Sequence, residues 1–487
     1  MLTFSWSNIR AKFSGMPMAT VVLLLIAGIV AAHYWGLSAL VWCGLLALFA
    51  IVSGFISVGV VPLLFALGGM VYSLHSYQPI AVGSSHKLII KITDEGIDYS
   101  RYSTHSADVM ECDGMYCRAR VRVTADSLVR LQSGDILALY GKIRPFEPAD
   151  GGYARSMYRQ GYSGRVTVTE DNSHFLRLAR RETLHHYAIG KLKSLVKPSD
   201  GRDVAISLSL GAKSISSTTL KQKYSYSGVS HLLAVSGLHV GLVAMLINLL
   251  FLPLVSLWRG NIIRSGVVVA FIWLYVALCG YPTSAIRAAI MFSVLQLSHI
   301  SRSRYSPENS LFAAAFIMLI VEPTMLFEIA FQLSFIAVMA IVFVGAPLNR
   351  MLGVRIPLLR GVVSGLVISL VCVVATAPLI SHTFGVVSVL SIFVTPVALV
   401  TTQIIIISSL LALILPTSAA EVVMRAAEWC GTVQNRIVEW SVSPKIGFAE
   451  YQIGEGMMIA IYVVMVLIVV LSFGCKITHD KKDESVN

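Results

Sequence analysis

The chain has 487 residues, of which 56% are hydrophobic and 13% are charged, and its mean hydropathy is +0.74. This composition excludes a soluble globular domain and predicts an α-helical protein that crosses a membrane several times. The net charge of +12 is explained first by the excess of Lys and Arg on the cytoplasmic side of membrane proteins, so charge alone does not predict an anionic ligand.

The N-terminal region, residues 1–80, contains three apolar runs, each long enough to cross a hydrocarbon core of about 30 Å. No small-residue cleavage site follows the first run, which therefore predicts a retained span and not a signal peptide. Arg10 and Lys12 place its start in the cytoplasm, so three crossings put the next segment outside. The predicted spans are residues 18–35, 36–54 and 55–77.

The next segment, residues 81–175, alternates apolar and polar side chains, as in YCRARVRVT and GDILALYGKI. A period of two with glycines between the runs predicts a small inserted extracytoplasmic β domain. An OB-like barrel fits the short strands, and a generic β sandwich fits almost as well.

Arginines gather on one strand of this domain. Arg118, Arg120 and Arg122 alternate with apolar residues and therefore share one face. With Tyr116 and Tyr140 nearby, this face suits single-stranded nucleic acid through phosphate contacts and base stacking. The alternative is an ordinary solvated strand face with tyrosines packed beneath it.

The same domain contains the string CDGMYC. Cys112 and Cys117 lie close enough across a turn to form a disulfide if the domain faces an oxidising compartment. Two isolated cysteines predict no metal site.

Residues 176–228 mix apolar and basic residues at a helical period and predict amphipathic helices along the membrane surface. Residues 229–475 are nearly all apolar and predict the main transmembrane domain, followed by a basic cytoplasmic tail at 476–487. Within it, residues 388–416 fit either one span broken at Pro396 or two re-entrant halves. The basic tail favours the two halves, because a single crossing would place it outside.

The transmembrane domain begins with GVSHLLAVSGLHVG, residues 228–241, which is rich in small and polar residues. At about 100° per residue on a continuous helix, two faces separate. One face suits close helix packing, and the other faces either a polar path or backbone carbonyls that satisfy neutral histidines. The packing face carries Ser230, Ala234, Gly237 and Gly241, and the polar face carries His231, Ser236 and His239.

The string HLLAVSGLHVG resembles the signature of the ComEC competence family, and further blocks follow in that family's order. These are YPTSAIRAAIM, EPTMLFEIAFQLSFIAVMAI and ATAPLISHTFGVVS, while residues 134–166 resemble the family's OB-like domain. The resemblance implies a multi-pass channel in the bacterial inner membrane that conducts single-stranded DNA into the cytoplasm during natural transformation. It also implies contacts with membrane lipid, a periplasmic DNA receptor and a cytoplasmic helicase-like ATPase, and leaves monomer and homodimer open.

Many members of that family carry a metallo-β-lactamase-like domain, but no His-x-His-x-Asp-His string occurs here. The resemblance is therefore to a short form without that domain, either a natural one or a truncation. The string GAKS lacks the pattern of a P-loop, so we expect no ATP hydrolysis, no cofactor and no enzymatic activity. Two alternatives are an intramembrane hydrolase using Ser236 and a small-solute transporter.

Four further polar residues belong to the family-like blocks. Arg287 either extends outward to the membrane surface or contacts phosphate at the channel mouth. Glu328 would repel phosphate and is predicted to pair with a cation such as Arg287. Gln332 and Ser334 are further candidates to line the path.

Overall fold

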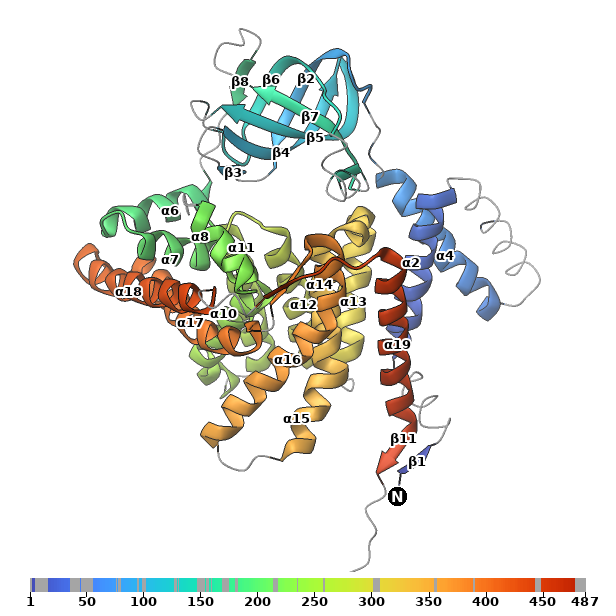
Figure 1. Cartoon of the computed structure of the whole chain (residues 1–487), viewed down its shortest axis with the longest axis vertical. Helices are drawn as coiled ribbons and strands as arrows, with labels where there is room; N and C mark the ends of the chain where they lie inside the picture. Colours follow the sequence, from blue (N-terminus) through green and yellow to red (C-terminus); the bar gives the residue numbers. More distant parts are fainter. Residues whose placement is uncertain are drawn as a thin grey trace, which may run out of the picture.

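The computed structural model consists of a large group of helices with a small β domain at one end (Figure 1). This arrangement confirms the predicted helical membrane protein with an inserted β domain. The structure describes residues 2–4, 16–35, 44, 56–75, 77, 80–93, 96–98, 102–126, 129, 131–146, 154, 157–158, 160–168, 175–179, 183–212, 218–233, 235–256, 259–300, 307–353, 357–388, 390–442 and 448–477.

The first two helices are α2 (Pro17–Trp35) and α4 (Ile56–His75), which pack against each other through glycines. A Cβ added to Gly28 would collide with the carbonyl of Phe65, and one added to Gly68 would collide with the carbonyl of Leu25. Only glycine allows the two backbones to approach this closely. The predicted span at 36–54 lies outside the described residues apart from Gly44.

The β domain has a core of residues that alternate along the strands, as the period of two predicted. Ile90, Val121 and Leu137 are fully buried in it. Strand β5 pairs with β7 in parallel, and the other pairs are antiparallel. The strands are β2 (Ser85–Ile92), β3 (Ile97–Asp98), β4 (Tyr102–Cys112), β5 (Met115–Asp126), β6 (Ile136–Lys142), β7 (Tyr162–Val168) and β8 (Phe175–Ala179).

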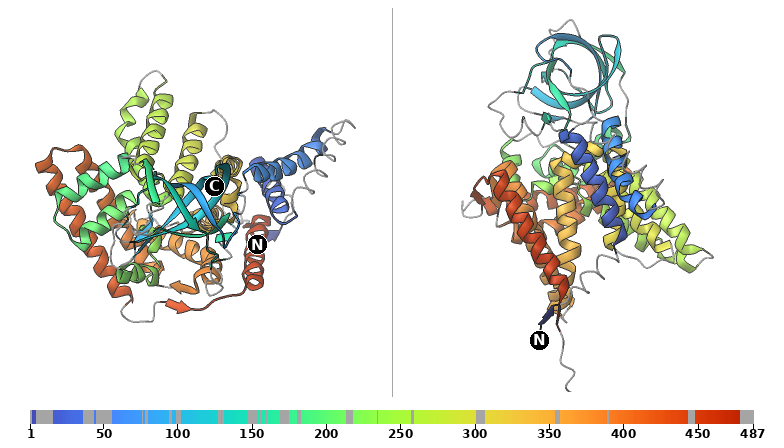
Figure 2. Two further views of the ribbon diagram at one scale, coloured as in Figure 1. Left: turned by 90° about the horizontal axis from the view of Figure 1, so that it is seen from above. Right: turned by 90° about the vertical axis from the view of Figure 1, so that its right-hand side faces the viewer.

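The order of the strands is β7-β5-β4-β2-β6-β8, with β3 beside β4. The sheet is strongly curved (Figure 2), and an isolated bridge joins Arg144 to Arg165, but the ladders leave β7 and β8 as edges. The pairing therefore supports a small mixed sheet and not a closed barrel. Because β8 runs from Phe175 to Ala179, the domain extends past the predicted boundary at residue 175.

The segment after the β domain contains α6 (Leu184–Leu195), α7 (Asp200–Leu210), α8 (Thr218–Tyr226) and the short α9 (Ser230–Leu233). The placement of this segment along the membrane surface stays a prediction, and α7 packs against protein. Residues 204–210 are all buried, and Gly201 approaches Gly431 closely where α7 packs on α18. An apolar helix face with small residues packs equally well against protein and lipid.

Six helices among the described residues are long and apolar enough to cross a membrane. One of them, α17, is a single helix that contains Pro396, so the expected pair of re-entrant halves is wrong. The helices of this domain are α10 (Gly237–Leu250), α11 (Gly260–Leu278), α12 (Thr283–Ile300), α13 (Pro307–Val321), α14 (Ile329–Ala340), α15 (Ala346–Leu352), α16 (Pro357–Phe384), α17 (Ser391–Ile414), α18 (Thr417–Val442) and α19 (Glu455–Gly474).

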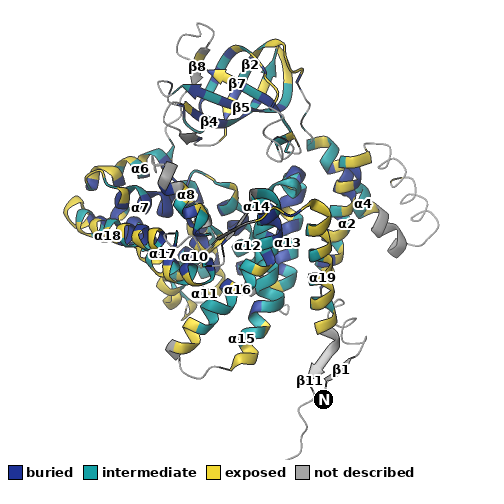
Figure 3. Cartoon of the chain, in the orientation of Figure 1, coloured by how far each residue is buried: buried dark blue, intermediate teal, exposed yellow. Residues whose placement is uncertain are grey.

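Many residues of these helices are exposed or only partly buried (Figure 3), and large hydrophobic side chains are among the exposed ones. Along α19 the side chains of Val463, Val466 and Ile468 are each more than half exposed, as expected for contact with lipid. Strand β1 (Leu2–Phe4) pairs with β11 (Cys475–Ile477), so the two end segments lie together. Figure 1 places this pair at the end of the molecule opposite the β domain.

Candidate nucleic-acid path

The segment GVSHLLAVSGLHVG does not form the continuous helix that the prediction assumed. The chain leaves the helical conformation at Val235 and Ser236, and α10 begins at Gly237. The backbone N–H of Ser236 donates to Nδ1 of His239 at 2.8 Å, in the manner of a helix cap. The two-sided helical wheel is therefore wrong, because it requires one unbroken helix through residue 236.

This break also positions the neighbouring helix. The Val235 carbonyl accepts a hydrogen bond from Oγ of Ser284, in the first turn of α12. A carbonyl released by a helix break needs such a partner when it is buried. The break thus fixes the start of α12 next to the start of α10 through this hydrogen bond.

The small residues of α10 face α12, as the packing prediction required. A Cβ added to Gly241 would lie 2.8 Å from Cζ of Phe292, and one added to Gly237 would lie 3.7 Å from Cβ of Ala288. Gly241 is therefore at a tight contact and Gly237 at an ordinary one. Ala234 and the side chains of Ser230 and His231 lie outside the described residues.

The predicted polar residues of this segment do not form one exposed face. His239 is fully buried, and Ser236 is half-buried. Because Nδ1 of His239 is already an acceptor, its role is structural at that atom. The buried, hydrogen-bonded alternative therefore fits His239 better than a place on an open polar path.

Arg287 is a buried arginine in the helical domain. It lies on α12 and is only 3% exposed, so it does not extend outward to the membrane surface. Its Nε and Nη1 atoms are buried and have no hydrogen-bond partner among the described residues. A buried guanidinium with free donors is costly and marks a candidate ligand site.

The predicted partner Glu328 precedes α14 and interacts electrostatically with Arg287 and with Arg120 of the β domain. No ion pair within 4.0 Å joins it to Arg287 among the side chains that the structure describes. Gln332 donates from Nε2 to the carbonyl of Leu326 at 2.9 Å, which ties α14 to the preceding turn. Ser334 is half-buried two residues later, and a separation of about 200° places it on another side of α14.

The arginines of β5 share one face, as predicted, but two of them are turned towards the helices. Arg120 donates from Nε to Oδ1 of Asp108 at 3.1 Å and lies over the ring of Tyr77 at 4.3 Å. Arg118 contacts the carbonyl of Leu74 at 3.4 Å and Oε2 of Glu322 at 3.7 Å. This face is thus a junction between the β domain and the helical domain.

Together these side chains form one group, called here the junction cluster. Burial raises the pKa of Tyr77 above its ordinary value, which keeps the phenol neutral beneath the arginines. Burial acts to lower the pKa of Arg120, but Tyr77 and Asp108 outweigh it and raise that pKa. The members are Tyr77, Asp108, Arg118, Arg120, Arg287, Glu322 and Glu328.

The remaining β-domain candidates lie outside the junction cluster. Arg122 donates to the hydroxyl of Ser106 at 2.8 Å. Tyr116 is 85% exposed near the tip of the β4–β5 hairpin, and Tyr140 is 47% exposed on β6. Both rings are therefore accessible from solvent. Sequence reasoning missed Tyr77 and Glu322, because they lie far from β5 along the chain.

The two cysteines of the hairpin are free thiols on the same face of the sheet. They are close enough to interact electrostatically, and burial raises the pKa of both thiols. The disulfide stays a prediction. Both thiols already lie on the same face, so forming it requires no change in the direction of either side chain relative to the sheet.

Comparison with known proteins gives a consistent family. The family model of the competence proteins matches residues 208–475, more than half of the chain. Over 190 residues the chain is 30% identical to ComE operon protein 3 of Bacillus subtilis, covering 38% of this chain and 24% of that protein. It is 29% identical over 222 residues to an uncharacterized protein of Aquifex aeolicus, covering 45% and 50%. The matches thus span half or less of these curated relatives, and no solved structure matches.

Proposed function

Because the chain belongs to the ComEC family of competence proteins, we propose that it conducts single-stranded DNA across the bacterial inner membrane. The observation that carries this proposal is the buried guanidinium of Arg287 within the junction cluster, whose Nε and Nη1 have no partner among the described residues. It lies in the matched range, while Arg118 and Arg120 bring positive charge from the β domain to the same place. In this proposal the cluster is the entrance of the DNA path.

The chemistry of a guanidinium suits this role. Its planar donors match phosphate oxygens, and a charge-assisted hydrogen bond is about twice as strong as a neutral one. A strand that threads the junction offers phosphates to donors that now lack partners. Glu322 and Glu328 balance the arginines when no DNA is present, and they keep the entrance from holding DNA too tightly.

The arrangement of the ends supports the proposed orientation. The paired segments β1 and β11 lie opposite the β domain (Figure 1). Arg10 and Lys12 favour the cytoplasm for that end, so the β domain belongs on the periplasmic side. A DNA receptor would deliver the strand there, and a helicase-like ATPase would draw it into the cytoplasm, as the family resemblance implies.

The test is uptake of radiolabelled DNA by cells in which the gene is deleted and then restored. Restoration with the unaltered gene should recover transformation, and Arg287→Met should not. Arg350→Met is the matched control, because Arg350 lies on α15 and is exposed. Immunoblots of membranes establish equal amounts of protein. Normal uptake in the deletion strain, or with Arg287→Met, would contradict the proposal.

The alternative of an intramembrane hydrolase gains no support from the geometry. A base for the Ser236 hydroxyl needs a free imidazole lone pair, and Nδ1 of His239 accepts from the backbone N–H of Ser236. Ser236→Ala retains that N–H, so we expect it to leave DNA uptake within about twofold, below the tenfold that 1.4 kcal/mol represents. Loss of cleavage of a membrane substrate in this variant would favour the hydrolase instead.

A further inference from the structure

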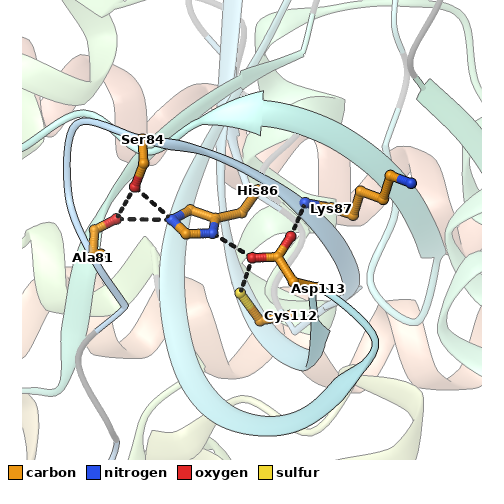
Figure 4. A network of polar contacts seen from close by, with 6 residues as sticks. All are labelled: Ala81, Ser84, His86, Lys87, Cys112 and Asp113. Atoms are coloured by element: carbon orange, nitrogen blue, oxygen red, sulfur yellow. Dashed lines mark hydrogen bonds and ion pairs between the residues drawn. The ribbon is translucent and has the colours of Figure 1, made fainter.

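A compact polar network lies where β2 begins, beside the β4–β5 hairpin (Figure 4). Nδ1 of His86 is 2.7 Å from Oδ2 of Asp113, and Sγ of Cys112 is 3.8 Å from the same oxygen. The three donor atoms all lie within 4.8 Å of one another. The sequence prediction of no metal site considered only the two cysteines, whereas the fold adds an imidazole and a carboxylate.

Hydrogen bonding on the other side of the imidazole determines what Nδ1 can do. Nε2 of His86 is 3.2 Å from the carbonyl of Ala81 and 2.8 Å from the hydroxyl of Ser84. A carbonyl only accepts, so this contact requires that Nε2 carries the hydrogen. In the neutral ring Nδ1 then presents a lone pair to a carboxylate at 2.7 Å, and the two repel. A cation removes this repulsion, either as a second proton that lets Nδ1 donate to Oδ2 or as a metal ion bound by both atoms.

Hydrogen bonds also fix the orientation of the Asp113 carboxylate. Its Oδ1 accepts from the backbone N–H of Lys87 at 2.9 Å, and the N–H of Asp113 donates to the Lys87 carbonyl at 2.8 Å. Asp113 and Gly114 both have positive φ, in the tight turn that an Asp-Gly pair favours. These bonds leave Oδ2 directed at His86 and Cys112.

We propose that His86, Cys112 and Asp113 bind a divalent transition-metal ion of the Zn²⁺ type through Nδ1, Sγ and Oδ2. Tetrahedral Zn²⁺ needs its nitrogen, sulfur and oxygen ligands roughly 3.3–3.8 Å apart, so small side-chain rotations suffice. Metal-bound histidines usually donate their other N–H to a carbonyl, and metal-bound carboxylates accept further hydrogen bonds. Ala81 and Lys87 supply both of these contacts.

The fourth ligand is water, as in zinc sites with three protein ligands. Cys117 lies on the same face as Cys112 and interacts with it electrostatically. A disulfide between them would remove the Cys112 thiolate, so disulfide and metal are exclusive states of one hairpin. The metal state therefore belongs to the reduced protein.

The contacts of Ser84, His86 and Asp113 also follow the order of a hydrolase triad. A triad requires an unprotonated Nε2 to take the serine proton, and the Ala81 carbonyl opposes that state. Nor does a triad employ Cys112. The ion explains all three donors. Ser84→Ala removes no ligand and leaves the Ala81 carbonyl as a partner of Nε2, so it should weaken metal affinity less than His86→Ala does.

The experiment titrates the reduced full-length protein in detergent with Co²⁺ as the probe. We expect one Co²⁺ per chain, a thiolate-to-cobalt charge-transfer band in the near ultraviolet, and displacement by Zn²⁺. Cys112→Ser should abolish the band, and His86→Ala and Asp113→Asn should each weaken affinity by at least about tenfold. Glu111→Gln is the matched control, because this neighbouring carboxylate is not among the three donors and should change nothing. No band in the unaltered protein, or a band that persists in Cys112→Ser, would overturn the proposal.

A second variant keeps the test decisive if substitution disturbs folding. Cys117→Ser cannot form the disulfide, so it should bind Co²⁺ without reductant, and Zn²⁺ should raise its unfolding temperature. Failure of both would also overturn the proposal. Because no DNA is involved, the result is independent of the proposed transport function.

Discussion

Arg120 and Arg287 belong to the same cluster but lie in different domains, and they differ in whether the guanidinium has interaction partners. Arg120, on the β domain, is paired with Asp108 and stacked on Tyr77. Arg287, in the helical domain, is 3% exposed and leaves two nitrogens without partners among the described residues. The comparison separates an arginine that joins two domains from an arginine that is available to a ligand.

The energetic difference supports this division. A buried charge without a close partner costs several kcal/mol, and replacing it with an apolar side chain is often neutral or stabilising. A paired and stacked arginine at a domain junction instead contributes to stability. On stability alone Arg120 is favourable and Arg287 is not, which agrees with the ligand-binding role proposed for Arg287.

The largest predicted effect comes from Arg287→Met. Loss of a charge-assisted hydrogen bond worth about 1.5–3 kcal/mol should weaken single-stranded DNA binding about 10- to 100-fold. The free energy of unfolding should stay the same or rise by about 1–4 kcal/mol, because the variant no longer buries a charge. Fluorescence anisotropy and thermal unfolding of the purified protein measure the two effects. A loss of stability together with unchanged DNA affinity would reverse the roles assigned to the two arginines.

The next effect concerns the helix that carries Arg287. Gly241→Ala places a Cβ 2.8 Å from Cζ of Phe292 on α12, so we expect a loss of about 1–3 kcal/mol in the free energy of unfolding. Gly237→Ala is the matched control, because its Cβ meets Ala288 at an ordinary 3.7 Å. Because Gly237 is the first residue of α10, the helical preference of alanine should add less there than the about 0.5–1 kcal/mol that it adds within a helix. Chemical denaturation measures both, and equal effects would contradict the tight contact between α10 and α12.

The sequence predicted those features that depend on local patterns. Alternation along β5 put Arg118, Arg120 and Arg122 on one face, and hydropathy located the apolar helices. The partners of those arginines were missed, because Tyr77 and Glu322 come from other parts of the chain. Periodicity describes which way a side chain points and not what the fold places opposite it.

The helix break at Val235 and Ser236 was missed for a different reason. A helical wheel presumes continuity, and it assigned the small and polar residues of 228–241 to two faces of one helix instead of to a break. A capping pattern was nevertheless present, since Ser236 and His239 have the spacing of a capping box with histidine in the place of glutamate. Interpreting that pair as a helix start, and not as a polar face, would have predicted the break.

A smaller predicted effect is the coupling energy between Arg120 and Tyr77 at the junction of the two domains. Arg120→Met and Tyr77→Leu should each destabilise the protein, and the double variant should reveal a coupling of about 0.5–2 kcal/mol. The reference is the pair Arg122 and Tyr77, since Arg122 is bonded to Ser106 and should couple by less than about 0.5 kcal/mol. Chemical denaturation of the four variants in each cycle supplies the values. Equal coupling in both cycles would mean that Arg120 does not join the two domains through Tyr77.

The smallest predicted effect, that of Glu322→Gln, tests whether Arg118 only joins the two domains or also binds a ligand. Arg118 and Glu322 are 3.7 Å apart and partly exposed, so Glu322→Gln should lower stability by less than about 1 kcal/mol, and 1 M salt should remove the difference. The same change frees Arg118 for phosphate, so single-stranded DNA affinity should rise about two- to fivefold, the equivalent of that energy. Anisotropy at low salt measures the gain, and Asp126→Asn, at the far end of β5, is the control that should show none. A fall in DNA affinity with Glu322→Gln would mean that Arg118 acts only in docking, and that the ligand-binding role belongs to Arg287 alone.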